Sequence, residues 1–319
     1  MRTFRFIPDN TRINFLRARW VCLGFSLFFF LGTLGLLATR GLNYGIDFAG
    51  GTLVEVKVEK ALPISEVRDT LQTAGMGSLV IQQYGAPDDI LIRMPGVQTE
   101  ENASATISNK ISGALGARAG KVEIRRVEYV GPQVGGELKE KGLLAIVLSA
   151  IAILIYVSIR FEFRFAVGAV VALIHDVMLT IGIFSLLQKE ISMPVLAALL
   201  TILGYSLNDT IVVFDRVREN MRKFKKRPLA ELLNLSINEM LNRTLMMSLT
   251  TLIVLVALFI WGGEVIHDFA FALLFGVLVG TYSSTYIASP VVLWLAGVSG
   301  STRPTEAQAK AKADDEAAE

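Results

Sequence analysis

The chain has 319 residues, of which 52% are hydrophobic and 19% are charged. Soluble proteins carry roughly 25% charged residues, and the mean hydropathy of this chain is +0.51. A net charge of +2 is too small to indicate nucleic-acid binding, one cysteine excludes an internal disulfide framework, and two histidines leave little material for a zinc site. The apolar residues form long runs, so the sequence predicts a polytopic membrane protein.

Six apolar runs are each long enough to cross a hydrocarbon core, which needs about 20 residues. The predicted spans cover residues 20–38, 142–159, 165–187, 194–214, 244–261 and 269–296. The sixth is long enough to be interrupted near Pro290. Residues 1–19 form a basic leader, and residues 297–319 are expected to form a disordered tail because they are rich in Ala, Lys, Glu and Asp.

Basic residues mark one side of the predicted bundle. They gather in the leader, in the link between the second and third spans, and in residues 216–227 between the fourth and fifth spans. Lys189 alone lies in a short link on the other side. Since Lys and Arg accumulate in cytoplasmic loops, both termini are predicted to be cytoplasmic and residues 39–140 extracytoplasmic.

Residues 39–140 have the periodicity of a small folded domain. Valines at positions 54, 56 and 58 alternate with charged residues, as in a strand with one buried face. Two helical patterns and three more strands complete the order βαββαβ, the ferredoxin-like split unit. The last strand changes phase at Arg125-Arg126, which indicates a bulge. The predicted fold is therefore six transmembrane helices with one α+β domain between helices 1 and 2.

Chemically active side chains inside the predicted membrane region are confined to spans three to five. They are His175, Asp176, Asn208, Asp209 and Arg243. A charge at the centre of a membrane helix costs roughly 2.5–3.5 kcal/mol by insertion scales, so such residues usually have a function. Tyr205 and Asp209, at i and i+4, share a helix face. Asp209 and Arg243 enter from the same side and are expected to meet at similar depth.

These residues allow two interpretations. In the first, Asp209 gains and loses a proton under the control of the nearby Arg243 guanidinium. In the second, the two residues form a static ion pair that locks helix packing, or Arg243 extends to the membrane interface. His175 and Asp176 either join the proton pathway or satisfy each other. No nucleotide-binding, hydrolase or metal-ligand motif occurs, so no enzyme activity, metal or cofactor is expected.

Small residues mark two further places. The link after the first span contains Gly45, Asp47, Gly50 and Gly51. Glycines can adopt positive φ, so this link is either a purely structural connection to the first strand or a hinge anchored by Asp47. Small residues at positions 276, 280 and 284 predict close helix packing in the sixth span.

Two stretches carry a family resemblance. Residues 43–52 have the sequence Asn-Tyr-Gly-Ile-Asp-Phe-Ala-Gly-Gly-Thr, and residues 204–213 have Gly-Tyr-Ser-Leu-Asn-Asp-Thr-Ile-Val-Val. The first resembles the G-[IL]-D-F-x-G-G-T signature of the SecD/SecF family, and the second resembles the fourth-span motif of its SecF branch. Residues 128–135 and Arg243-Thr244 also match that branch. The resemblance covers nearly all of the chain.

The resemblance implies an auxiliary subunit of the Sec translocase in the bacterial inner membrane, within the resistance-nodulation-division superfamily. Its implied partners are SecD, the SecYEG channel, unfolded preproteins and membrane lipids, with no nucleic acid. It maps a proton-path carboxylate onto Asp209 and its partner arginine onto Arg243, with H⁺ as the coupling ion. Two alternatives stay open. One is an assembly scaffold that moves nothing, and the other is half of a small-molecule or lipid exporter, although such exporters usually carry larger outer domains.

Overall fold

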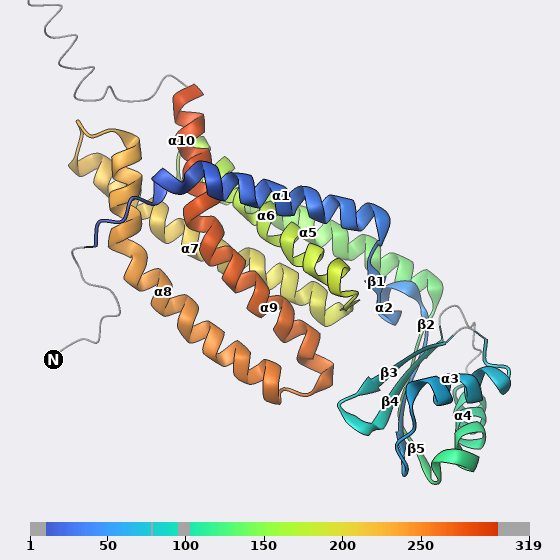
Figure 1. The fold of residues 1–319 in the computed structure, drawn as a ribbon. Coiled ribbons are helices and arrows are strands. Elements are labelled where there is room, and N and C mark those ends of the chain that lie inside the picture. The colour runs from blue at the N-terminus through green and yellow to red at the C-terminus, as the bar shows by residue number, and fades with distance from the viewer. Residues whose placement is uncertain (1–10, 78, 95–102, 299–319) are drawn as a thin grey trace, which may run out of the picture.

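The computed structural model describes residues 11–77, 79–94 and 103–298. Much of the basic leader and the tail expected to be disordered therefore lie outside the described residues. Six helical segments of the described chain are long and apolar enough to cross a membrane. A small α/β domain lies at one end of this bundle, and the first and last described residues lie at the other end (Figure 1). The fold class predicted from the sequence is confirmed.

Five of the spans are single helices. They are α1 (Arg19–Thr39), α5 (Pro132–Arg160), α6 (Phe163–Leu187), α7 (Met193–Lys223) and α8 (Leu229–Trp261). Helices α5, α7 and α8 extend well beyond the predicted spans, because hydropathy detects only the part of a helix that is apolar enough for the hydrocarbon core. A short 3₁₀ helix (Phe15–Ala18) precedes α1.

The sixth span is interrupted. It consists of α9 (Glu264–Ser283), a π-helical turn (Ser284–Ala288) and α10 (Ser289–Val298). The interruption lies just before Pro290, whose missing N–H cannot serve the carbonyl four residues earlier. Such π-helical turns occur frequently at functional sites.

The α/β domain has the ferredoxin-like order. Its elements are β2 (Gly51–Val58), α3 (Ile64–Thr73), β3 (Val80–Tyr84), β4 (Ala86–Met94), α4 (Ala103–Ala119) and β5 (Val122–Val130). The strand order is β3-β4-β2-β5 and every neighbouring pair is antiparallel. The predicted bulge is present, since Glu55 pairs with Arg126 whereas Val56 pairs with Ile124.

The two faces of this sheet have different partners. Val54, Val56 and Val58 are fully buried in a core shared with helices α3 and α4. On the opposite face, Leu53 and Leu91 pack with Ile46 of the short helix α2 (Ile46–Ala49). The face of the sheet that contains Leu53 and Leu91 is therefore the one that lies toward the membrane bundle (Figure 1).

The glycine-rich link holds the domain close to the bundle. Gly50 and Gly51 have φ of +70° and +127°, so the predicted use of glycine conformational freedom is confirmed at both positions. A Cβ on Gly50 would lie 2.8 Å from the Pro132 backbone. Just before this link, β1 (Asn43–Tyr44) pairs in parallel with β6 (Glu190–Ile191), the segment between α6 and α7.

The predicted small-residue packing is also present. Gly276 packs against Ile202 of α7, and a Cβ on Gly280 would lie 3.1 Å from Ser206 Cβ. These glycines let α9 approach α7 closely. The approach brings Ser206 and Ser283 into the same polar cluster.

Candidate functional site

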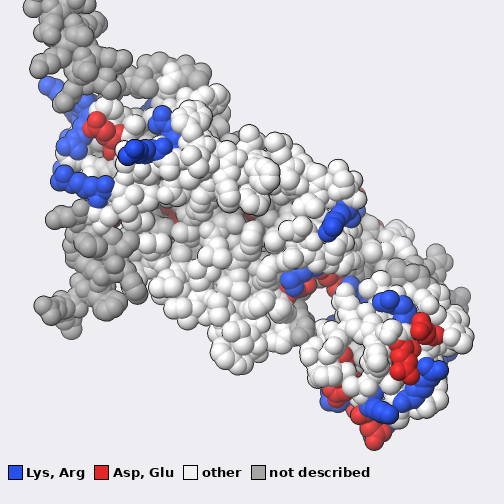
Figure 2. All heavy atoms as spheres, in the orientation of Figure 1, with Lys and Arg blue, Asp and Glu red and all other residues white. Residues whose placement is uncertain are grey.

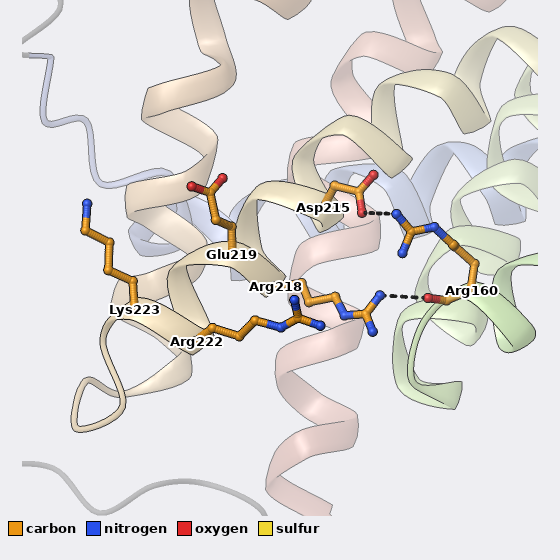
Figure 3. A pocket seen from close by; sticks show the side chains of 6 residues that line it. All are labelled: Arg160, Asp215, Arg218, Glu219, Arg222 and Lys223. Carbon is orange, nitrogen blue, oxygen red and sulfur yellow. Dashed lines mark hydrogen bonds and ion pairs between the residues drawn. The ribbon is translucent and has the colours of Figure 1, made fainter.

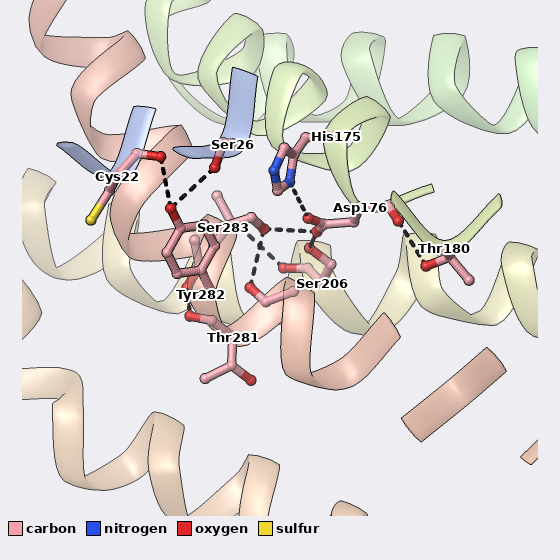
Figure 4. A network of polar contacts seen from close by, with 12 residues as sticks. Cys22, Ser26, His175, Asp176, Thr180, Ser206, Thr281, Tyr282 and Ser283 are labelled. Atoms are coloured by element: carbon pink, nitrogen blue, oxygen red, sulfur yellow. Dashed lines mark hydrogen bonds and ion pairs between the residues drawn. The ribbon is translucent and has the colours of Figure 1, made fainter. Parts of the chain in front are cut away.

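Asp176 of α6 lies at the centre of a buried polar cluster (Figure 4). Its side chain has no exposed surface. Its Oδ2 accepts hydrogen bonds from Ser206 Oγ at 2.6 Å and from Ser283 Oγ at 2.7 Å. Its Oδ1 lies 3.0 Å from Nδ1 of His175. Three helices, α6, α7 and α9, thus meet at one carboxylate.

This arrangement suits an ionised carboxylate. Hydrogen bonds to a charged acceptor are stronger than those between neutral groups, and they offset part of the cost of burying the charge. If Nδ1 of His175 donates to Asp176, the neutral ring carries its free lone pair on Nε2. That nitrogen is buried without a hydrogen-bond partner in the described chain. In that tautomer the cluster contains an unused proton acceptor.

The polar cluster extends to the first span through Tyr282. The rings of His175 and Tyr282 lie 6.3 Å apart. The Tyr282 hydroxyl donates to the Cys22 carbonyl at 2.9 Å and lies 3.0 Å from Ser26 Oγ. Helix α1 is thereby connected to the α6–α7–α9 interface (Figure 4).

Asp209 forms a second buried carboxylate on α7. Its side chain is almost fully buried, and Oδ2 has no hydrogen-bond partner in the described structure. Thr244 of α8 lies beside it, and the Thr244 hydroxyl is also buried without a well-aligned partner. Asp209 follows Ser206 by three residues, so the two carboxylates occupy successive levels of the bundle interior.

The expected ion pair between Asp209 and Arg243 does not form in this structure. The Arg243 side chain is exposed and makes no ion pair with any described residue. Adjacent residues on a helix point about 100° apart, and it is Thr244 that faces Asp209. Asn208 is exposed as well, whereas the half-buried Tyr205 donates to Thr251 Oγ1 at 3.2 Å. Of the predicted proton-path residues on α7 and α8, Asp209 therefore lies in the bundle interior, whereas Asn208 and Arg243 lie on its surface.

The signature loop contacts the start of α7. Asp47 Oδ2 accepts a hydrogen bond from the backbone N–H of Met193, the first residue of α7, at 2.8 Å. Arg93 of β4 forms an ion pair with Glu190 of β6. Burial lowers the pKa of the Arg93 guanidinium, while the carboxylates of Asp268 and Asp47 act to raise it. The predicted anchor, Asp47, therefore binds the helix that carries Ser206 and Asp209.

Sequence reasoning missed the side chains that hold Asp176. Ser283 lies 107 residues from Asp176, and serine is an ordinary residue in a membrane helix. The available signal was the series of small residues at positions 276, 280 and 284, which predicted the helix contact without its chemistry. Among the described residues, no group of three or more His, Cys, Asp or Glu side chains could hold a metal ion.

Comparison with known proteins decides the family. Residues 110–298 match the model described as protein export membrane protein SecD/SecF, C-terminal, and residues 35–61 match the SecD/SecF GG motif. A protein translocase subunit SecF from Magnetococcus marinus is 52% identical over 285 residues, covering 89% of this chain and 92% of the relative. The chain belongs to the SecD/SecF family. A SecF subunit from Vibrio alginolyticus is 47% identical, with 92% of each chain covered.

Solved structures of SecDF share this fold. A crystal structure of SecDF from Thermus thermophilus, described as a translocon-associated membrane protein, has a TM-score of 0.83 and 36% identity. It covers 92% of this chain, which spans 40% of that SecDF chain. A SecDF structure in a super-membrane-facing form has a TM-score of 0.69 at 37% identity, with 94% of this chain and 40% of that chain covered. The resemblance to the SecD/SecF family predicted from residues 43–52, and to its SecF branch predicted from residues 204–213, is confirmed.

Proposed function

We propose that the chain pairs with a SecD subunit in the bacterial inner membrane, with both termini cytoplasmic. The pair uses proton-motive force to promote export of unfolded preproteins through the SecYEG channel, with H⁺ as the coupling ion and no cofactor. The observation that carries this proposal is the presence of two buried carboxylates, Asp176 and Asp209, at successive levels of one bundle. Membership of the SecD/SecF family supports the export role.

The two carboxylates have different parts in this proposal. Asp176 is held in place by two serine hydroxyls that donate to it and by the adjacent His175 ring, so in this proposal it acts as the fixed polar centre of the bundle. Asp209 has an oxygen without a partner, so it can take up a proton without breaking a hydrogen bond at that atom. Protonation removes a charge from the α7–α8 interface and changes the preferred packing of these helices. Because Asp47 binds the first residue of α7, the movement reaches the α/β domain.

The energy of a proton gradient is sufficient for such a change. One proton moving down about 100 mV releases about 2.3 kcal/mol. That free energy shifts a two-state equilibrium about 50-fold. A pair of helix arrangements of similar stability is therefore driven almost completely into one state.

The exposed polar residues support a protein partner at this site. By helical rise, Asn208 lies about 22 Å from the start of α7, and Arg243 lies about 27 Å from the end of α8. Both values are within the roughly 30 Å of a hydrocarbon core, where lipid tails offer no hydrogen bonds. SecD covers this face in our proposal, and Arg243 reaches Asp209 or a carboxylate of SecD in another state of the cycle.

The decisive experiment replaces Asp209 with asparagine in the SecD-bound complex. Asp209→Asn keeps the shape of the side chain and removes the titratable proton. We expect normal insertion and normal recovery with SecD, but loss of the export that proton-motive force stimulates. Asp209→Glu keeps the carboxyl group and is expected to retain part of the activity. Export into membrane vesicles, measured with and without an imposed gradient, tests both.

Arg243 supplies the matched comparison. Arg243→Lys keeps the charge and loses the planar guanidinium, so a partial defect is expected. If the chain is only an assembly scaffold, the loss of the Asp209 charge leaves export unchanged as long as the complex assembles. Gradient-stimulated export by a well-assembled Asp209→Asn complex would therefore refute proton coupling through this residue and favour the scaffold.

A further inference from the structure

A basic hollow lies at the end of the bundle remote from the α/β domain (Figure 3). Its volume is about 440 Å³. It is lined by Arg160 at the end of α5 and by residues of the last turns of α7, namely Asp215, Arg218, Glu219, Arg222 and Lys223. Lys and Arg gather at this end of the molecule, whereas the visible middle of the bundle is almost uncharged (Figure 2).

The acidic residues of the hollow are already engaged. Asp215 Oδ1 lies 3.2 Å from Nη2 of Arg160. Glu219 Oε2 lies 2.6 Å from Nη1 of Arg216, which is outside the lining. Neither carboxylate is therefore free to neutralise the remaining cations.

Three cations of the hollow form no ion pair with a carboxylate in the described part of the chain. Arg218 donates from Nη1 to the Arg160 carbonyl at 3.0 Å. Lys223 lies over the ring of Phe224, with Nζ 5.3 Å from its centroid. Arg222 is exposed and pairs with no described residue. The hollow thus keeps an excess of positive charge.

Arg218 and Arg222 are arranged to share an anion. They lie one helical turn apart on α7, and Arg222 extends toward Arg218 (Figure 3). Like charges at this i, i+4 spacing destabilise a helix. An anion between them removes that repulsion, and guanidinium groups bind phosphate oxygens in pairs.

The surroundings of the hollow favour an amphiphile over a free anion. The hollow is bordered by Arg160, the last residue of α5, where the chain turns into α6. Both of these helices are apolar enough to cross a membrane. Side chains of this junction project outward, with Ile159 83% exposed and Phe163 69% exposed. We propose that the hollow binds the phosphate headgroup of an anionic phospholipid, whose acyl chains lie along these apolar side chains.

The test measures lipid binding to the full chain in nanodiscs of phosphatidylcholine containing a small fraction of phosphatidylglycerol. Arg222→Gln removes a cation that forms no hydrogen bond or ion pair with any described residue, so we expect the fold to be retained. A basic residue near an anionic lipid surface contributes about 1 kcal/mol, which corresponds to about 5-fold in affinity. Arg218→Gln with Arg222→Gln is expected to weaken phosphatidylglycerol binding about 30-fold. Native mass spectrometry of the released complexes counts the retained lipids.

The matched control is Lys225→Gln with Lys226→Gln, which removes the same charge just beyond α7. It is expected to retain phosphatidylglycerol as the unchanged chain does. An equal loss in the control would show a diffuse charge effect and overturn the site. A second outcome would also overturn the proposal. If inorganic phosphate binds in pure phosphatidylcholine discs and this binding needs Arg222, and if phosphate displaces phosphatidylglycerol from the mixed discs, the ligand is a free anion rather than a lipid. Binding is measured without an ion gradient, so failure of proton coupling leaves this test unaffected.

Discussion

At the scale of single residues, the bundle contains two carboxylates in different surroundings. Asp176 accepts hydrogen bonds from two serine hydroxyls and lies beside a histidine nitrogen, and all of these groups are buried. Asp209 is nearly as buried but leaves one oxygen unused. The same side-chain type therefore has both carboxylate oxygens in contact with polar groups at one level of the bundle and one oxygen without a hydrogen bond at the next.

This difference predicts opposite costs for the same substitution. Asp176→Asn replaces an acceptor oxygen with an amide that faces hydroxyl donors, and we expect it to lower the free energy of unfolding by about 1–3 kcal/mol. Asp209→Asn is expected to change it by less than about 0.5 kcal/mol, because its Oδ2 has no hydrogen bond to lose. Unfolding in mixed detergent micelles measures both. Equal losses for the two variants would contradict the assignment of their environments.

The sequence locates these residues on the correct helices but not on the correct faces. The order of residues along the two helices predicts that Asp209 and Arg243 lie at similar depth. In the structure, however, Thr244 rather than Arg243 faces Asp209. Helix α8 is apolar around much of its circumference, so periodicity does not indicate which side meets α7. The serines that donate to Asp176 belong to other helices, so the residue pattern within α6 alone cannot predict these hydrogen bonds.

At the scale of elements, the polar ends of helices and the glycine-rich link determine how the domain meets the bundle. The buried face of each strand and the bulge of the domain follow from alternation, because a one-residue shift would move every buried valine to the other face. The helical extensions beyond the membrane do not follow from hydropathy. The start of α5 at Pro132 matters most, since it brings the helix backbone against Gly50.

The glycine-rich link gives a prediction with an internal control. Gly50→Ala places a Cβ against the Pro132 backbone and forces a side chain into positive φ, so we expect a loss of more than about 1 kcal/mol in the free energy of unfolding. Gly136→Ala, in the first turns of α5, meets no atom within 4 Å. It is expected to be neutral or slightly stabilising, as alanine favours helix. Thermal unfolding of the two variants in detergent compares them, and similar midpoints would argue against a strained link.

At the scale of the whole molecule, the two ends of the bundle differ in charge and in structure. The basic residues of the α7–α8 region lie at one end, and the α/β domain lies at the other (Figures 1 and 2). Because basic residues stay on the cytoplasmic side, the domain is expected outside the cytoplasm.

A reporter that is active only outside the cytoplasm tests this orientation. Inserted at Gly77, which is exposed in the domain, it is expected to be active. Fused after Lys225, between α7 and α8, it is expected to be inactive. Measurement of protein level in each fusion serves as the control. If the reporter is active after Lys225 and inactive at Gly77, the orientation is the opposite of the one predicted here.

The parallel pairing of β1 with β6 has a mechanical consequence. A domain tethered at a single flexible point can turn about three axes. This domain is held on two sides. The β1–β6 pair and the ion pair between Arg93 and Glu190 hold it on one side, and the direct passage from β5 into α5 holds it on the other. Two fixed sides leave rotation about the line that joins them, so we expect the domain to tilt as a lever with one axle rather than to swing as a pendulum. Any force that tilts it acts on residues 190–193 and pulls on the first turn of α7.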